Sequence, residues 1–382
     1  MREILPITIF AMICAVISHN TSGYDPIGCR YHRKERLFYA ILTIGLIIFA
    51  GLRTGYNDTA VYRSQYQTAV KEIEAGQGVL DGIDWLKIGD NPGFFVVLRV
   101  MALMKVPLQS YIMIFSAFYI GVNLWFFRKY SCNIWLSILI YISFAGFVFS
   151  LAAIKQCTAM ALCLLATDRA IHKKYIRFVL YVLVACLFHP YALMYLIVPF
   201  MFFRPWSKYT VFMLIIFGAV GFGMQSLVGT ILNVTDMLGE SYDANTFVGE
   251  GVHPARLMVT AVPLVLSLLT AQQIQENEDR EQYVITNLTM LNAEIMFVAL
   301  FGTANYFARL ANYFIPFQAV CLPWLLKHYD YKGRQTMTVL ATTGYSLFYL
   351  YSYFIYENFD ANYWNITLRE YLKSLFEGLV FG

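Results

Sequence analysis

Four basic side chains stand beside apolar segments that lie far apart in the chain: Arg53, Lys155, His189 and Arg309. Ionisable groups at membrane depth cost free energy, and where they occur they tend to mark function. Cations that face one cavity repel each other unless the cavity holds a polyanion such as a diphosphate. If their helix ends converge, these residues predict a basic pocket for such a ligand.

Each of these residues also has a simpler explanation. Arg53 and Lys155 could direct their charges to phospholipid headgroups. His189 stands before Pro190, where it could cap a helix, and Arg309 could set the topology of a short loop. Because all four are expected at the same depth in the membrane, a shared site is favoured over four separate explanations.

Residues that could act as an acid, a base or a metal ligand are scarce near these cations. Asp58 is the sole acid between Arg53 and Tyr66, and Glu250 and His253 lie in a later polar stretch. The sequence has no Asp-x-Asp pair and no His and carboxylate cluster at metal-ligand spacing, so neither a metal nor a cofactor is predicted. It also lacks the G-x-S-x-G and P-loop motifs.

Several aromatic residues and one acid can each be interpreted either as structural residues or as part of a binding site. Tyr56, Tyr62 and Tyr306 belong to a group that crowds the expected outer boundary, which is typical of an interfacial aromatic belt. Aromatic faces also suit sugar rings. Glu294 stands in the middle of an apolar segment, where a buried structural partner is favoured over a role in binding substrate.

The composition indicates what kind of fold must position these residues. Of the 382 residues, 59% are hydrophobic and 14% are charged, and the mean hydropathy is +0.55. These values lie outside the usual range of soluble domains. The apolar runs have lengths close to those that cross about 30 Å of hydrocarbon. We therefore predict one all-α polytopic membrane domain over residues 1–382. The net charge of +4 gives no reason to expect nucleic acid as a partner.

The apolar runs predict about twelve transmembrane helices. The predicted crossings are residues 4–18, 37–52, 111–127, 134–151, 158–171, 176–188, 191–203, 211–227, 257–271, 287–303, 313–326 and 336–355.

Short basic loops orient these crossings, because Lys and Arg are enriched on the cytoplasmic side of membrane proteins. The basic loops share one side only if segment 92–107, which begins and ends with proline, does not cross. We expect this segment to be re-entrant or interfacial on the outer face, an arrangement that a membrane protein tolerates where protein buries the backbone. Both termini are then outside.

Three stretches are predicted to lie on the outer face. They are residues 53–110, which include the re-entrant segment, residues 228–256, and the tail 358–382. In the tail, residues from Trp364 to Leu379 place an apolar face opposite a charged one, so an amphipathic helix lying in the interface is expected.

Five short motifs on this predicted outer side carry a resemblance to a known family. They are Gly51, Leu52 and Arg53 followed by Gly55, Asp58 and Tyr62; Pro92, Gly93 and Phe94; Ile154, Lys155 and Gln156; Phe188 and His189; and Arg309, Tyr313 and Phe314. In order and approximate spacing the chain resembles the EpsG branch of the Wzy-type polysaccharide polymerases over nearly its whole length. Two positions depart from the family pattern: Lys155 replaces the usual arginine, and Asn91 precedes Pro92 where an acid is common.

The resemblance implies a GT-C-like integral membrane glycosyltransferase. Such an enzyme would join polyprenyl-diphosphate-linked oligosaccharide repeat units into exopolysaccharide, capsule or O-antigen. It would work on the outer face of the bacterial plasma membrane, beside membrane lipid and with a Wzz-like chain-length regulator and a flippase as partners. The lipid diphosphate would be the leaving group, and cations would stabilise its developing charge.

The resemblance and the chemistry together give a set of expected site residues. The expected catalytic residues are Asp58, His189, Arg53 and Arg309, with Asp58 or His189 as the base. The expected substrate-binding residues are Lys155, Gln156, Tyr62, Asn312, Tyr313, Glu250, His253 and Arg256. Glu250 and His253 are expected to shape the acceptor site and not to perform the chemistry.

Other functions stay open at the level of sequence. A flippase or transporter of lipid-linked oligosaccharide would place charge near the midplane, within repeats that the sequence does not show. A transferase similar to the O-antigen ligases would use similar chemistry on another acceptor. An acyltransferase would need a catalytic histidine in its own acidic or polar context, whereas Phe188-His189-Pro190 offers the histidine alone.

Overall fold

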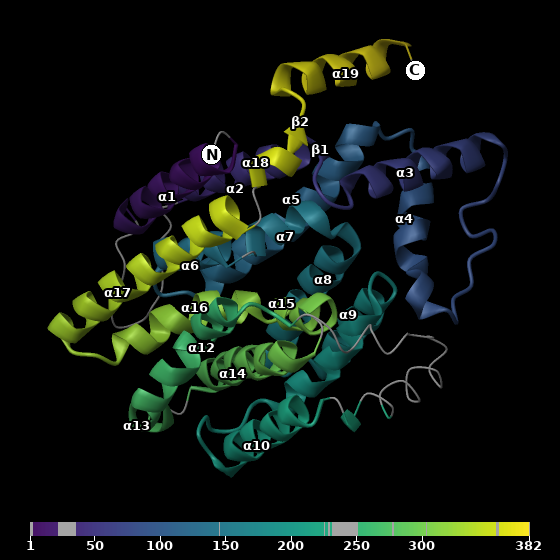
Figure 1. Ribbon diagram of the computed structural model, residues 1–382. Helices are drawn as coiled ribbons and strands as arrows, with labels where there is room; N and C mark the ends of the chain where they lie inside the picture. Colours follow the sequence, from purple (N-terminus) through teal and green to yellow (C-terminus); the bar gives the residue numbers. More distant parts are fainter. Residues whose placement is uncertain are drawn as a thin grey trace.

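The computed structural model describes residues 3–21, 36–144, 146–224, 226–227, 230, 251–276, 279–302, 304–356 and 359–381. These residues fold almost entirely into helices, with one two-stranded sheet (Figure 1). The elements of the first half are α1 (Ile4–Thr21), α2 (Arg36–Gly51), β1 (Arg53–Gly55), α3 (Thr59–Glu74), η2 (Ile88–Asp90), α4 (Pro92–Leu103), α5 (Leu108–Tyr130), α6 (Ile134–Ser143), α7 (Gly146–Ala152) and α8 (Ile154–Ile171).

The second half continues the helical pattern. Its elements are α9 (Tyr175–Cys186), η3 (Pro190–Phe200), α10 (Lys208–Phe222), α12 (Pro254–Leu269), α13 (Ala271–Glu276), α14 (Arg280–Phe301), η5 (Ala304–Ala308), α15 (Arg309–Asn312), α16 (Ile315–Lys327), α17 (Tyr331–Leu350), η6 (Tyr351–Tyr356), α18 (Phe359–Asn362), β2 (Trp364–Asn365) and α19 (Leu368–Phe381).

Local sequence signals explain where several of these helices begin. Asn133, Asp279 and Asp330 are the N-caps of α6, α14 and α17, and each side chain accepts a backbone hydrogen bond from the first turn. Proline stands in the first turn of α4, η3, α12 and α16, where its missing N–H costs no helical hydrogen bond.

The all-α polytopic prediction agrees with these helices. By length and composition, α1, α5 and α14 are able to cross a membrane, and a fourth span is added if the bent pair α6 and α7 forms one. Seven shorter apolar helices accompany them. Each predicted crossing overlaps helical structure, but not always one straight α-helix: residues 134–151 fall on α6 and α7, which are bent by 46°, and residues 191–203 fall largely on the 3-10 helix η3, which ends at Phe200. The number of helices that cross remains a prediction.

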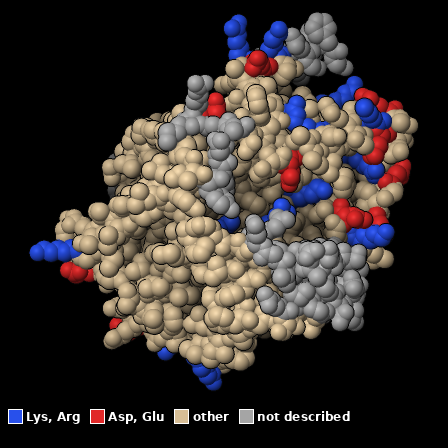
Figure 2. All heavy atoms as spheres, in the orientation of Figure 1, with Lys and Arg blue, Asp and Glu red and all other residues tan. Residues whose placement is uncertain are grey.

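The distribution of charge fits a membrane protein. In the view of Figure 2, charged side chains gather over the region of α3 and α4 and beside α19, with a few more at the opposite edge. Between these charged regions, the described surface in this view shows few Lys, Arg, Asp or Glu side chains. Exposed side chains on η3 and α10 include Leu193, Phe212 and Ile215, which lipid can cover.

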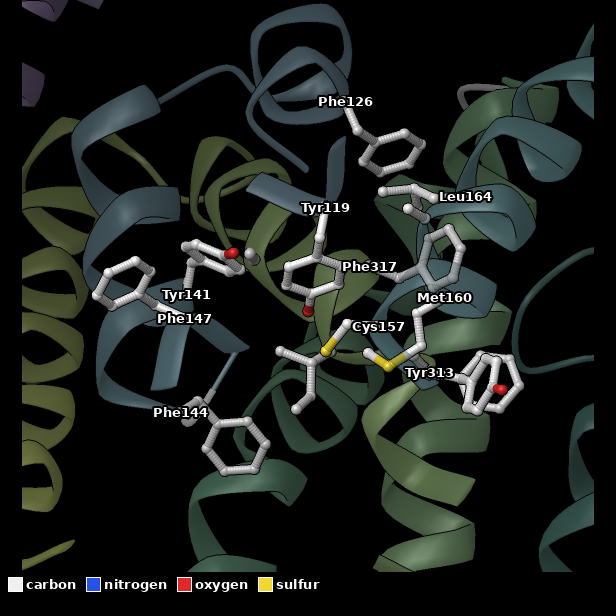
Figure 3. Close-up of a cluster of buried hydrophobic side chains, with 14 of the residues drawn as sticks. Tyr119, Phe126, Tyr141, Phe144, Phe147, Cys157, Met160, Leu164, Tyr313 and Phe317 are labelled. Atoms are coloured by element: carbon white, nitrogen blue, oxygen red, sulfur yellow. The ribbon is translucent and has the colours of Figure 1, made fainter. Parts of the chain in front are cut away.

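The buried core extends through most of the helices, and an aromatic-rich cluster within it brings together side chains of α5, α6, α8 and α16 (Figure 3). The Phe126 and Phe317 rings meet edge to face with their centroids 5.6 Å apart. Buried tyrosines place their hydroxyls on backbone carbonyls: Tyr119 donates to Gly146 over 3.2 Å, and Tyr195 donates to Tyr313 over 2.8 Å. Such bonds avoid the cost of an unpaired hydroxyl in an apolar interior.

Helix α4, which contains most of the predicted re-entrant segment, and the start of α5 after it are each attached to the end of another helix. At the start of α4, the Gly93 amide donates to the Leu187 carbonyl just after α9 over 2.9 Å. A Cβ on Gly93 would lie 2.7 Å from that of Leu187, so only glycine permits this approach. At the start of α5, the Gln109 side-chain amide donates to the carbonyls of Gly51 (2.6 Å) and Arg53 (2.9 Å). That segment 92–107 does not cross stays a prediction.

The C-terminal tail returns to the end of α2. Strand β2 pairs antiparallel with β1, so that Arg53 faces Asn365, and the Ile366 amide donates to the Leu52 carbonyl over 3.0 Å. The prediction that Trp364 belongs to the tail helix was wrong, because this backbone pairing draws it into β2 and the helix begins at Leu368.

A candidate diphosphate site at the helix ends

Arg53 is fully buried at the end of α2. Its Nε donates to the Thr59 hydroxyl over 3.3 Å, and its Nη1 donates to the Ser116 hydroxyl over 2.9 Å and to the Ala50 carbonyl. Its Nη2 has no hydrogen-bond partner among the described residues. Burial lowers the pKa of Arg53 to about 10, so the guanidinium stays charged at neutral pH. Full burial does not fit a side chain that reaches for lipid headgroups.

Lys155 and Gln156 lie in the first turn of α8, which begins at Ile154. The ammonium of Lys155 lies over the rings of Phe94 (4.9 Å) and Phe95 (4.8 Å) of α4. This is a cation–π arrangement that stabilises the charge. Burial has the larger effect on Lys155 and lowers its pKa, whereas the charges of Asp58 and Asp90 favour its charged form. The Gln156 amide donates to the Arg309 carbonyl over 2.7 Å, which joins the start of α8 to the start of α15.

Arg309 follows the π-helical turn η5 and is exposed. Single π-helical turns are rare and frequently occur at functional sites. Arg309 lies close enough to Tyr62 of α3 for its positive charge to act on the Tyr62 hydroxyl. Burial, and after it the charge of Asp58, raises the pKa of that hydroxyl, whereas the charge of Arg309 acts in the opposite direction. Tyr62 is buried against Phe94, with ring centroids 5.9 Å apart, and Asp58 is exposed just before α3.

His189 lies between α9 and η3, outside both helices, and is partly buried. Its Nδ1 is 3.0 Å from the hydroxyl of Tyr313, and its ring meets that of Tyr191 edge to face. Burial lowers the pKa of His189 to about 3, with further contributions from the positive charges of Arg309 and Lys155. The imidazole is therefore neutral at physiological pH and able to accept a proton.

The remaining predicted residues lie on α12 and α15 or just before them. Arg256 donates from Nη2 to the Asn312 side-chain oxygen over 2.8 Å. His253 caps α12 by accepting from the Ala255 amide over 3.2 Å, and its ring lies 5.5 Å from that of Tyr351. Glu250 lies outside the described residues.

The structure thus brings together many of the predicted residues. Lys155, Gln156, His189 and Arg309 converge from α8, α15 and the junction of α9 and η3. Tyr313 joins them through His189. Arg53 is fully buried, and the hydrogen bonds of its guanidinium go to Ala50, Thr59 and Ser116 and not to this group. Among the described residues, no group of three or more His, Cys, Asp and Glu side chains could hold a metal ion.

Sequence reasoning missed the residues that hold Arg53 in place. Thr59 and Ser116 bind its guanidinium, and Gln109 binds its backbone carbonyl. Gln109 carried a signal, since it is a polar residue directly after the predicted re-entrant segment. Ser116 carried none, because a serine inside an apolar helix usually bonds its own backbone, as Ser116 also does with Ile112.

These features define a class of protein: an all-helical polytopic membrane protein with a cluster of cations where several helices end. The chain belongs to the EpsG family, whose model matches residues 36–367. EpsG is a family of Wzy-type polysaccharide polymerases, so the expected family membership is confirmed. A general role in polysaccharide polymerisation and an association with the membrane follow from that membership. No curated protein and no solved structure matches the chain.

Proposed function

We propose that this protein joins polyprenyl-diphosphate-linked oligosaccharide repeat units into exopolysaccharide, capsule or O-antigen on the outer face of the bacterial plasma membrane. The observation that carries the proposal is the convergence of Lys155, His189 and Arg309 at one cluster of helix ends. Lys155 and Arg309 offer positive charge to a polyanion, neutral His189 lies beside them, and a lipid diphosphate is the leaving group of such a polymerase.

The reaction assigns a task to each side chain. A hydroxyl of the acceptor unit attacks the anomeric carbon of the donor glycan, the bond from that carbon to the diphosphate oxygen breaks, and the lipid diphosphate leaves. Arg309 binds that diphosphate with the fork of its guanidinium, and Lys155 adds a single charge. Arg53 contributes less directly, because Nη2 alone of its nitrogens lacks a partner among the described residues.

The proton of the attacking hydroxyl goes to a base, and two residues qualify. His189 is neutral and bonded to Tyr313, which orients its ring. Asp58 is exposed before α3, where it lies nearer to solvent. We assign the base to His189, and we assign acceptor binding to Arg256, Asn312 and His253 on the neighbouring helix ends.

The proposal includes a topology. Twelve crossings with both termini outside place Arg53, Lys155, His189 and Arg309 at outer ends of helices, and segment 92–107 lies along the outer face as part of a GT-C-like arrangement. The attachment of the start of α4 to the end of α9, and of the start of α5 to the end of α2, supports this topology.

The test compares cells and purified protein. A deletion strain should accumulate single lipid-linked repeat units that external glycosidases can reach, because flipping occurs before polymerisation. Purified protein in liposomes should convert these units into a ladder of polymers, and Arg309→Ala should not. Units trapped on the inner leaflet would favour a flippase. Transfer to a different acceptor without a ladder would favour a ligase.

A further inference from the structure

We infer that an apolar pocket beside Arg309 binds the polyprenyl chain of the lipid diphosphate, next to its headgroup. This inference rests on the proposed function for the identity of the lipid. The pocket lies between η3, α10, α14 and the segment from η5 to the start of α16, and it has a volume of about 250 Å³. Its lining consists of Met, Ile, Leu, Val and Phe side chains only.

The position of the pocket connects it to the diphosphate site. Phe307 and Leu310, which flank Arg309 in the chain, both form part of its wall. A diphosphate held by Arg309 would therefore bring the first carbons of its lipid to the mouth of the pocket. A charged or sugar ligand has no hydrogen-bonding partner in this lining, so the pocket suits a hydrocarbon.

Two helices that line the pocket differ in their burial, and lipid could enter on the less buried side. Leu291, Ile295 and Val298 of α14 are buried, whereas Phe217 and Val220 of α10 are partly exposed. α10 packs against α14, and η3 packs against α9 and α8. Apart from Lys208 and Tyr209 in the first turn of α10, the exposed side chains of η3 and α10 are apolar. Among the described residues, a chain arriving from the bilayer between these two helices therefore meets mainly apolar surface.

The size of the pocket fits the start of a polyprenyl chain. A water-sized group takes up about 30 Å³, so the pocket has room for about eight such groups, more than one five-carbon isoprene unit. The branched methyl of each isoprene unit also fills an irregular pocket better than a straight acyl chain does. The rest of the long chain would stay in the bilayer.

The experiment uses the purified full-length protein in phospholipid nanodiscs. The probe is a long polyprenyl diphosphate that carries a diazirine in the isoprene unit nearest the diphosphate. After illumination, mass spectrometry should find the label on η3, α10 or α14, and excess unlabelled polyprenyl diphosphate should suppress it. Val220→Trp, which fills the pocket, should reduce this labelling about tenfold. Val211→Trp makes the same change on an exposed part of α10 and should leave the labelling unchanged.

Three results would overturn the inference: label spread evenly over all lipid-facing helices, labelling of Val220→Trp equal to that of the unmodified protein, or suppression by excess phosphatidylglycerol as strong as by the polyprenyl lipid. Should Val220→Trp fail to fold, Val220→Phe and the labelling map of the unmodified protein decide the question. Because labelling does not depend on polymer formation, labelling without polymer would reject the proposed function and keep the pocket. Polymer formation without labelling of these helices would reject the pocket alone.

Discussion

Replacing Arg53 and Arg309 separately by lysine distinguishes a buried structural cation from a ligand-binding one. Both substitutions keep the positive charge and remove the planar fork of the guanidinium. Arg53 makes three hydrogen bonds from a fully buried position, whereas Arg309 is exposed. The same chemical change should therefore have different consequences at the two positions.

The magnitudes follow from the contacts. A hydrogen bond made by a charged group contributes about 1.5 to 3 kcal/mol, and a lysine at position 53 would keep fewer of the three. We expect Arg53→Lys to lose about 2 to 4 kcal/mol of folding stability, with activity falling as the site distorts. Arg309→Lys should change stability by less than about 0.5 kcal/mol. If Arg309 binds the leaving diphosphate, its turnover should fall about 30- to 1000-fold, or about 2 to 4 kcal/mol.

The assay pairs thermal unfolding in detergent with polymer formation from lipid-linked repeat units. Arg369→Lys on α19 is a matched control, because Arg369 is also exposed and lies outside the site. Turnover of Arg309→Lys within about threefold of the control would reject its role in binding diphosphate. A melting temperature of Arg53→Lys equal to that of the unmodified protein would reject the stabilising role of its hydrogen bonds.

Three further predictions test topology, the tail and the proton acceptor. Cysteine at exposed Met104 should react with an impermeant maleimide in intact cells, and cysteine at Arg204 only after permeabilisation; the reverse pattern would overturn the topology. A chain ending at Thr367 should keep most of its activity, whereas one ending at Asn362 should unfold at lower temperature, because it lacks β2; equal melting would contradict the importance of this pairing. Since neighbouring cations help to lower the pKa of His189 to about 3, bound diphosphate should raise it, so the acidic limb of kcat should lie at higher pH than that of kcat/KM; coincident limbs would contradict this.

Much of the helical framework could be predicted, because apolar periodicity and proline or Asx signals are local. The predicted crossings overlap helical segments, although residues 134–151 fall on two helices with a bend between them, and Arg309 does come near Lys155 and His189. The pairing of β2 with β1 could not be predicted, since it joins segments more than 300 residues apart with only two or three residues in each strand. Hydropathy says which segments are helices but not which helices are neighbours.

The same limit applies to Arg53. From the sequence it looks equivalent to Arg309, because both stand at ends of apolar segments. What separates them is the residues that surround each one, and Ser116 reaches Arg53 from a helix that begins more than 50 residues later. Burial of a charge depends on such long-range contacts, so spacing along the chain cannot reveal it.

The arrangement of the cations explains how a site without ligand tolerates so much positive charge. Arg309 is exposed, so water and salt screen its field. The charge of Lys155 lies over two aromatic faces, and His189 avoids a charge altogether by remaining neutral. Asp58 and Asp90 also favour the charged form of Lys155, but neither Lys155 nor Arg309 forms a salt bridge with a described residue. Arg99 of α4, in contrast, is paired with Glu72 of α3, 3.0 Å away. Cations without a direct acidic partner stay available to an anion, so we propose that those beside η5 bind a polyanionic ligand.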